Sequence, residues 1–244
     1  MNFIPAINLL YPRRCPVCQE IVAPNRENPL ICPECSRQLP YITGACCMKC
    51  GKGLWKEEQE YCSDCQRIPK HYVQGFPVFY YVEPLKKGVA AFKYHNRREY
   101  ADFYSEAIWN RYGIEFSRIH FDGILPIPIH RHKQQIRGYN QAELIARRLS
   151  RKMQVPCYNR QLTRNVDTLP QKELNDKERL RNLKKAFHFA GKGVKLDKVL
   201  LVDDIYTTGA TIEACTEILH QAGVEQVYYT SICIGKGMDD FSSC

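Results

Sequence analysis

Four C-x-x-C pairs in the first 65 residues restrict the fold of this chain more than any other feature of its 244-residue sequence. A two-residue gap lets one tight turn direct two thiolates at the same metal ion, and two such turns supply the four ligands of a tetrahedral zinc site. Thirteen residues separate the first two pairs and eleven separate the last two. We therefore predict two structural zinc sites in succession, with no open position for a substrate. The eight predicted ligands are Cys15, Cys18, Cys32, Cys35, Cys47, Cys50, Cys62 and Cys65.

The sequence leaves alternatives for these cysteines open. Cys46 adjoins Cys47 and can replace it as a ligand, the turns can pair in a cross-braced manner, and iron–sulfur clusters take the same ligand set. Disulfides are the remaining alternative.

Pro5 interrupts the first apolar stretch, and Arg13 and Arg14 follow that stretch instead of preceding it, so we expect no secretory leader. We also expect no membrane span, because no run approaches about eighteen apolar residues. A cytoplasmic, reducing location is expected, and it favours zinc over disulfides.

The composition changes after Cys65, where the cysteine pattern stops. Residues 69–75 are typical of a linker, and the apolar run 76–82 is typical of a strand. We therefore expect a zinc-ribbon-like module over residues 1–70 and a second domain over residues 71–244. The module has few large aliphatic side chains, so we expect it not to fold without its metal.

Strands and helices alternate in the second domain, and the strands are apolar on both faces. This pattern is typical of an α/β fold, with a mainly parallel sheet that helices cover on each side. The predicted strands are 76–82, 121–129, 157–163, 199–205 and 226–234. The predicted helices are 84–94, 98–112, one that begins after Asn140, a charged one over 176–186, and one from Ile212 to Ala222 that ends at Gly223.

Two loops at the carboxyl ends of these strands carry the predicted chemistry, because ligands collect there in open parallel sheets. The first loop places Asp203 and Asp204 at the end of a buried strand, directly before a helix start rich in threonine. Backbone N–H groups and hydroxyls at a helix start suit a phosphate dianion, whereas carboxylates accept hydrogen bonds from sugar hydroxyls. The pattern predicts a ribose 5-phosphate site. The alternative is an ordinary buried strand followed by a capped helix. The predicted phosphate-loop residues are Thr207, Thr208, Gly209, Ala210 and Thr211.

The second loop spans residues 130–143, after the strand 121–129. Arg131, Lys133 and Arg137 precede another helix start, and this provides a second place for anionic oxygens. The alternative is a solvated basic turn before an amphipathic helix.

The motif V-L-L-V-D-D-I-Y-T-T-G-A-T resembles the signature that binds 5-phosphoribosyl pyrophosphate (PRPP) in type I phosphoribosyltransferases. P-I-P followed by R-G-Y-N-Q-A resembles the corresponding segment of the ComF family of competence-associated proteins, and L-L-Y-P-R-R-C-P-V-C resembles the cysteine module of that family. The likeness extends from Leu9 to about Gly235. It implies a double zinc ribbon followed by a type I phosphoribosyltransferase-like domain.

The resemblance also implies a role for individual residues. Asp203 and Asp204 hold the ribose hydroxyls and are the candidate catalytic residues, and the loop 207–211 holds the 5-phosphate. Magnesium accompanies PRPP and stabilises the leaving pyrophosphate. Turnover, if it occurs, transfers the phosphoribosyl group to a nitrogen nucleophile. The candidate residues for the pyrophosphate end are Arg137, Gly138, Asn140 and Gln141.

Two further segments carry expectations from the family. Residues 171–174 and 179–187 resemble its Q-x-x-L and R-x-x-N-x-x-x-A-F pattern, which implies a lid over PRPP. Their spacing agrees equally with a solvated helix face. The hood that selects an acceptor is suspected between Phe92 and Arg98.

The positive charge of the chain is concentrated in one stretch. Residues 131–185 hold fifteen Lys or Arg against five Asp or Glu, and the whole chain has a net charge of +9. This stretch therefore accounts for all of the net positive charge of the chain. PRPP is too small to need so much basic surface, so single-stranded or duplex DNA is a second expected ligand, with solubility as the alternative.

Three functions therefore remain for the whole chain. The first is a PRPP-binding ComF-type protein associated with DNA uptake and natural transformation, with competence or DNA-processing proteins as partners. The second is a metabolic phosphoribosyltransferase whose acceptor is unknown. The third is a zinc-dependent nucleic-acid-binding scaffold with a vestigial PRPP site.

Overall fold

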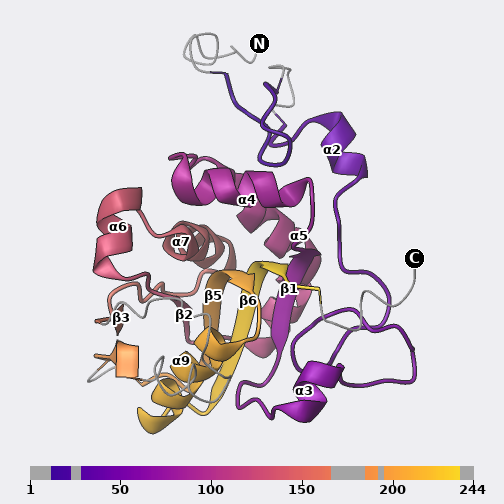
Figure 1. Ribbon diagram of the computed structural model, residues 1–244. Helices are drawn as coiled ribbons and strands as arrows, with labels where there is room; N and C mark the ends of the chain where they lie inside the picture. The colour runs from indigo at the N-terminus through magenta and orange to yellow at the C-terminus, as the bar shows by residue number, and fades with distance from the viewer. Residues whose placement is uncertain (1–11, 23–28, 166–184, 192–194, 237–244) are drawn as a thin grey trace, which may run out of the picture.

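A four-stranded parallel sheet forms the centre of the second domain (Figure 1). The structure is a computed structural model that describes residues 12–22, 29–165, 185–191 and 195–236. The strand order is β1-β6-β5-β2, and each neighbouring pair is parallel. The predicted fold class, a mainly parallel sheet flanked by helices, is confirmed. The strands are β1 (Gly75–Tyr80), β2 (Gly123–Pro126), β5 (Lys198–Tyr206) and β6 (Gln226–Ile234).

Strand β5 lies inside the sheet, between β2 and β6, and this position explains its composition. Residues 199–202 are fully buried because both faces of the sheet are covered. Leu200 and Val202 belong to the apolar core on one face, while Val199 and Leu201 belong to the core on the other. The sheet therefore separates two hydrophobic cores.

Each face of the sheet is covered by different helices. One core contains buried residues of α4 (Leu85–Tyr94), α5 (Tyr100–Ile119) and α7 (Gln141–Met153). The other contains the inner face of α9 (Ala210–Gln221). Within the part of the chain that the structure describes, no helix is long and apolar enough to cross a membrane.

Two helices differ from the sequence expectations. The basic segment expected to be a loop contains helix α6 (Arg131–Arg137), which begins after a cap contact from His132 N to the His130 ring and ends at Gly138 with φ of +73°. Helix α5 continues to Ile119 instead of ending near 112, because the buried ring of Phe116 extends its apolar face.

The predicted strand 157–163 is wrong in its position. Cys157 makes only an isolated bridge to Ile124, and the strand is β3 (Leu162–Arg164). It pairs antiparallel with β4 (Phe187–Phe189) in a separate two-stranded sheet, which sequence reasoning missed. The helix predicted over 176–186 lies almost wholly outside the described residues.

The cysteine-rich segment contains two short helices, α2 (Pro33–Arg37) and α3 (Ser63–Arg67), each beside a C-x-x-C turn. It also pairs with the sheet, because Ile42 N donates to Val78 O at 3.2 Å and Tyr80 N donates to Pro40 O at 2.8 Å. The segment therefore borders β1 along its length and shares the cores of the sheet. The domain boundary at residue 70 stays a prediction.

Candidate functional site

Two four-cysteine clusters lie in the N-terminal segment. In each cluster the four sulfur atoms lie within 4.8 Å of one another. The Sγ atoms of Cys18 and Cys32 are 3.8 Å apart, and those of Cys50 and Cys62 are 3.6 Å apart. Zinc–sulfur bonds of about 2.3 Å place tetrahedral sulfurs about 3.8 Å apart, so both clusters fit zinc. The first zinc site is Cys15, Cys18, Cys32 and Cys35, and the second zinc site is Cys47, Cys50, Cys62 and Cys65.

The clusters decide between the pairings that the sequence left open. Each site uses consecutive C-x-x-C turns, so the cross-braced arrangement is wrong. Cys46 lies outside the second cluster, and its Sγ contacts Gly44 O at 3.5 Å. The described cysteines form no disulfide.

The loop after β5 joins this strand directly to helix α9. Gly209 adopts φ of +77° and precedes the first residue of α9, so that the chain turns directly from strand to helix. Thr207 and Thr208 are exposed, and Thr208 Oγ1 accepts from Ala210 N at 3.5 Å. The N–H groups of the first helical turn have no partner within the helix, and the helix dipole adds positive potential there. This end of α9 can therefore accept an anion.

Two carboxylates lie immediately before that loop. Asp203 Oδ1 accepts from Asp204 N at 2.8 Å, and Lys93 Nζ lies 3.0 Å from Asp204 Oδ1. Burial and the neighbouring Asp204 charge raise the pKa of Asp203 to about 7, and the positive charges of Lys93 and Arg164 offset only part of this effect. Burial opposes the charge on Lys93, but the Asp204 carboxylate outweighs it and raises the pKa of Lys93. The negative charge of the pair is thus balanced by one partly buried ammonium, that of Lys93.

The second predicted loop leaves the same edge of the sheet. Because Pro126 pairs with Val202 and Ile127 N donates to Val202 O at 2.8 Å, β2 ends beside the start of the acidic pair. Arg137 lies at the end of α6 and Gly138 follows it. The structure therefore brings the two predicted loops to neighbouring strand ends.

Asn140 and Gln141 are buried, and their contacts lie within the protein. Asn140 caps α7 by accepting from Ala142 N at 3.1 Å, and it donates to Ile127 O at 2.9 Å. Gln141 donates to Lys93 O at 3.3 Å and accepts from Arg137 at 3.2 Å. These two residues therefore position the loop and the end of α4.

The end of α4 and the residues that follow it connect the two loops, in the segment from Phe92 to Arg98 that the sequence indicated as a hood. Lys93 contacts the acidic pair, while the guanidinium of Arg137 lies 4.8 Å from the Tyr94 ring centroid. Arg98 donates to Gly138 O at 3.1 Å and stacks over the Tyr139 ring at 4.9 Å. No local motif identifies Lys93, because its partner lies 111 residues further along the chain.

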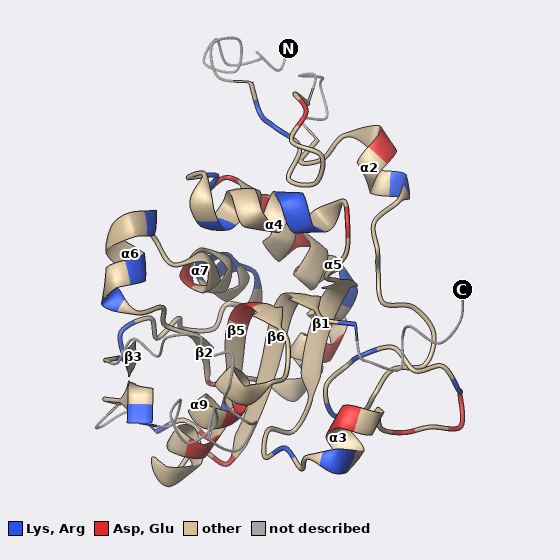
Figure 2. Ribbon diagram, viewed as in Figure 1, with Lys and Arg blue, Asp and Glu red and all other residues tan. Residues whose placement is uncertain are grey.

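The basic stretch is only partly available to an anionic partner. Arg148 pairs with Asp102 at 2.6 Å, Lys152 with Glu106 at 2.6 Å, and Arg147 with Glu143 at 2.8 Å. Much of the positive charge of α7 is therefore neutralised within the fold. Helix α6 contributes three basic and no acidic residues, and Figure 2 shows this basic helix at the periphery of the domain. The predicted lid residues 171–174 and 179–184 lie outside the described residues.

The zinc clusters and the parallel sheet define the class of the protein: a double zinc ribbon joined to an α/β domain with acidic and threonine-rich strand ends. Residues 6–66 match the family model of the double zinc ribbon domain. Two solved adenine phosphoribosyltransferases, one of them from Saccharomyces cerevisiae, are each 15% identical with a TM-score of 0.38 over 59% of this chain. The match covers 74% of the first and 72% of the yeast chain.

Curated relatives then give the family. Competence protein F of Haemophilus influenzae is 31% identical over 81% of this chain and 87% of its own length. Competence protein ComFC of Bacillus subtilis is 26% identical over 79% of each chain. DNA utilization protein YhgH of Escherichia coli is 27% identical over 83% of this chain and 89% of its own length. The chain belongs to the competence protein F (ComF) family, as the sequence resemblance predicted.

Proposed function

We propose that this protein binds PRPP with magnesium where β5 and β2 end, and that it acts in the cytoplasm in the uptake or use of DNA. One observation carries the proposal: the acidic pair Asp203 and Asp204 directly precedes the exposed threonine loop and the start of α9. Hydroxyl acceptors beside phosphate donors match the two ends of a ribose 5-phosphate.

Each group of residues has a separate task in this site. The carboxylates of Asp203 and Asp204 accept hydrogen bonds from the ribose hydroxyls, and Lys93 keeps that acidic pair from repelling the anionic ligand. Residues 207–211 donate N–H and O–H groups to the 5-phosphate. Arg137 and the backbone at Gly138 bind the pyrophosphate end, since a guanidinium forms paired hydrogen bonds with phosphate oxygens.

The donor set also fits magnesium, which prefers carboxylate and phosphate oxygens and retains several waters. Asp203 and Asp204 would hold the ion, together with oxygens of PRPP. When bound, magnesium neutralises charge on the leaving pyrophosphate. The protein itself contributes positioning of the sugar and electrostatic stabilisation, and no covalent nucleophile is required.

DNA is the second proposed ligand, and helix α6 supports it. Three of its seven residues are basic, and its exposed surface includes Ile136, which is 71% exposed. Basic side chains bind phosphates, and exposed apolar groups contact unstacked bases. The names of the relatives, competence proteins and DNA utilization proteins, agree with this role.

Titration of Mg²⁺ and PRPP into the zinc-loaded protein tests the first ligand. We expect saturable binding that is lost when Asp203→Asn and Asp204→Asn are combined. The matched control is Asp197→Asn, an exposed carboxylate just before the opposite end of β5, which should leave the affinity unchanged. No binding to the unmodified protein would refute the proposal and favour a scaffold with a vestigial site.

Two further assays address turnover and DNA. Release of pyrophosphate in the presence of purines, pyrimidines or simple amines would identify a metabolic phosphoribosyltransferase, in which a C1–N bond forms as the bond from C1 to pyrophosphate breaks. Binding of single-stranded DNA should weaken with salt. It should also weaken with Arg131→Glu, whereas Arg147→Glu, whose charge Glu143 already neutralises, should have a smaller effect.

A further inference from the structure

We propose that the second zinc site holds the phosphate loop in its binding conformation, so that zinc at this site and a sugar phosphate at residues 207–211 strengthen each other's binding. The inference rests on the proposed function for its ligand. It is carried by the juxtaposition of the 47–50 zinc turn, the connecting residues 70–72 and the end of β5.

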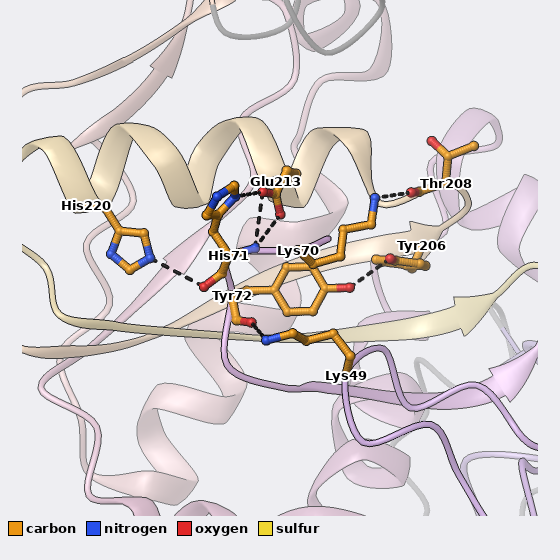
Figure 3. Close-up of polar contacts among 8 residues, drawn as sticks. All are labelled: Lys49, Lys70, His71, Tyr72, Tyr206, Thr208, Glu213 and His220. Carbon is orange, nitrogen blue, oxygen red and sulfur yellow. Dashed lines mark hydrogen bonds and ion pairs between the residues drawn. The ribbon is translucent and has the colours of Figure 1, made fainter. Parts of the chain in front are cut away.

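The connecting residues 70–72 lie against the phosphate loop and α9 (Figure 3). Lys70 Nζ donates to Thr208 O at 3.1 Å, within the phosphate loop itself. His71 N donates to both carboxylate oxygens of Glu213 at 3.1 Å, and the His71 ring also contacts this carboxylate. Glu213 lies in the first turn of α9 and its side chain is 3% exposed. The connection is therefore anchored on the helix start by polar contacts, of which those to Glu213 are partly buried.

The same connecting residues are held on their other side by the second zinc site. Lys49, between two zinc ligands, donates from Nζ to Tyr72 O at 2.7 Å (Figure 3). In addition, Gly75 N donates to Lys49 O at 2.8 Å. Gly51 adopts φ of +72°, and a Cβ there would lie 2.6 Å from Gly75 O. The zinc turn thus packs directly onto the chain that enters β1, with no room for another side chain.

Three buried tyrosines form a second route from the zinc turn to the loop. Tyr229 donates from its hydroxyl to Cys50 O at 2.8 Å, and its ring stacks on Tyr206 at 4.8 Å with an interplanar angle of 8°. The Tyr206 and Tyr72 hydroxyls lie 2.8 Å apart. Tyr206 is the last residue of β5, and a Cβ on Gly209 would lie 2.2 Å from its hydroxyl. The phosphate loop therefore folds over a ring whose position depends on the zinc turn.

The first zinc site provides an internal control, because it packs on the opposite face of the sheet. Its Cys15 belongs to the core with α4, α5 and α7, whereas Cys47, Cys50 and Cys62 share a core with Tyr206 and α9. The Tyr104 hydroxyl donates to Pro16 O at 2.9 Å, which is the counterpart of the contact between Tyr229 and Cys50. Between the described residues of the first site and those of the phosphate loop, no hydrogen bond is formed.

Mutual stabilisation follows from thermodynamic linkage. If zinc orders the loop that binds the sugar phosphate, the bound sugar phosphate must oppose loss of that zinc by the same factor. A hydrogen bond typically contributes about 1 kcal/mol net, which is about fivefold in an equilibrium constant. Removing one hydrogen bond between the zinc turn and the phosphate loop should therefore lower this mutual stabilisation by about fivefold. The variant Tyr229→Phe removes only the hydroxyl that contacts Cys50 O, and Tyr104→Phe removes the equivalent hydroxyl at the first site.

The test measures zinc loss at each site in the full-length protein. A zinc-selective chelator is added, released thiols are alkylated, and mass spectrometry follows the two cysteine sets separately. We expect Mg²⁺ with PRPP to slow alkylation at the second site only, and Tyr229→Phe to reduce that protection about fivefold. Tyr104→Phe should leave it unchanged. Equal protection of both sites, or none in a protein that binds PRPP by titration, would overturn the inference while leaving the proposed function intact.

Hydrogen exchange without any ligand separates the two proposals. Release of the second zinc, and Tyr229→Phe alone, should accelerate amide exchange in residues 206–213, whereas Tyr104→Phe should not. If exchange in this segment is unaffected, the inference is wrong whatever the ligand. If exchange accelerates but PRPP does not bind, the loop is held by zinc as inferred and the proposed ligand alone is wrong.

Discussion

The partly buried Asp203 carboxyl makes a measurable prediction about pH. Its pKa is raised from 3.8 to about 7, mainly by burial and then by Asp204. The folded protein therefore retains a proton that the unfolded chain releases near pH 4, so this group lowers stability as pH rises from about 4 to about 7. Asp203→Asn keeps the shape and the acceptor for Asp204 N but cannot ionise, and it should remove this loss.

The magnitude follows from the two pKa values. Between about pH 5.5 and pH 8, the shift makes the folded wild type about 2 kcal/mol less stable relative to the variant. For a chain of this size, about 2 kcal/mol corresponds to roughly 4–8 °C in Tm. The Tm of the variant minus that of the wild type should therefore grow by this difference between about pH 5.5 and pH 8. Loss of zinc at low pH affects both proteins equally, so it cancels in this difference.

Thermal unfolding followed by circular dichroism at several pH values in that window, with zinc present and magnesium absent, measures the difference. Asp197→Asn serves as the control, since it changes an exposed carboxylate at the other end of the same strand region and its difference should stay flat. A constant difference for Asp203→Asn would show that this carboxyl ionises normally in the folded protein, and the burial argument would fail.

Three other changes test the site. Lys93→Met leaves the Asp204 carboxylate without its ammonium partner, and should cost about 2–3 kcal/mol at pH 8 by urea unfolding; an unchanged midpoint would contradict the ion pair. Gly209→Ala places a Cβ against the Tyr206 hydroxyl at a positive φ, so PRPP affinity should fall at least tenfold by titration, and full affinity would refute the loop geometry. Asn140→Ala removes a helix cap and should lower stability by about 1 kcal/mol, and unaltered Tm would argue against the cap.

Local patterns predicted the parts of the fold that local chemistry determines. The C-x-x-C turns bind metal because of their own spacing, and the run 199–202 is apolar because β5 is buried on both faces. The acids near the end of β5 and the threonines and glycine that follow this strand likewise indicated that a helix comes next, although it begins at Ala210, two residues before the expected start. These features depend on a few consecutive residues, so a sequence displays them directly.

Contacts between distant segments were not predictable in the same way. The pair of Lys93 with Asp204 joins residues 111 positions apart, and Tyr229 meets Cys50 across 179 positions. Helix α6 was assigned to a loop because its seven residues show no apolar periodicity and none is buried. Strand β4 has only three residues and depends on pairing with β3, so its sequence alone gives a weak signal.

The covering of both sheet edges has a consequence for how this protein meets others. Residues 40–42 hydrogen bond along β1, and residues 156–158 do the same along β2, where Ile124 N donates to Pro156 O and Tyr158 N donates to Ile124 O. An uncovered edge strand invites an added strand from another molecule, by partner capture or by aggregation. Here irregular chain occupies those positions, so a strand from another molecule cannot pair with the main sheet there. A fragment that starts after the cysteines would uncover the β1 border and be prone to aggregate through it.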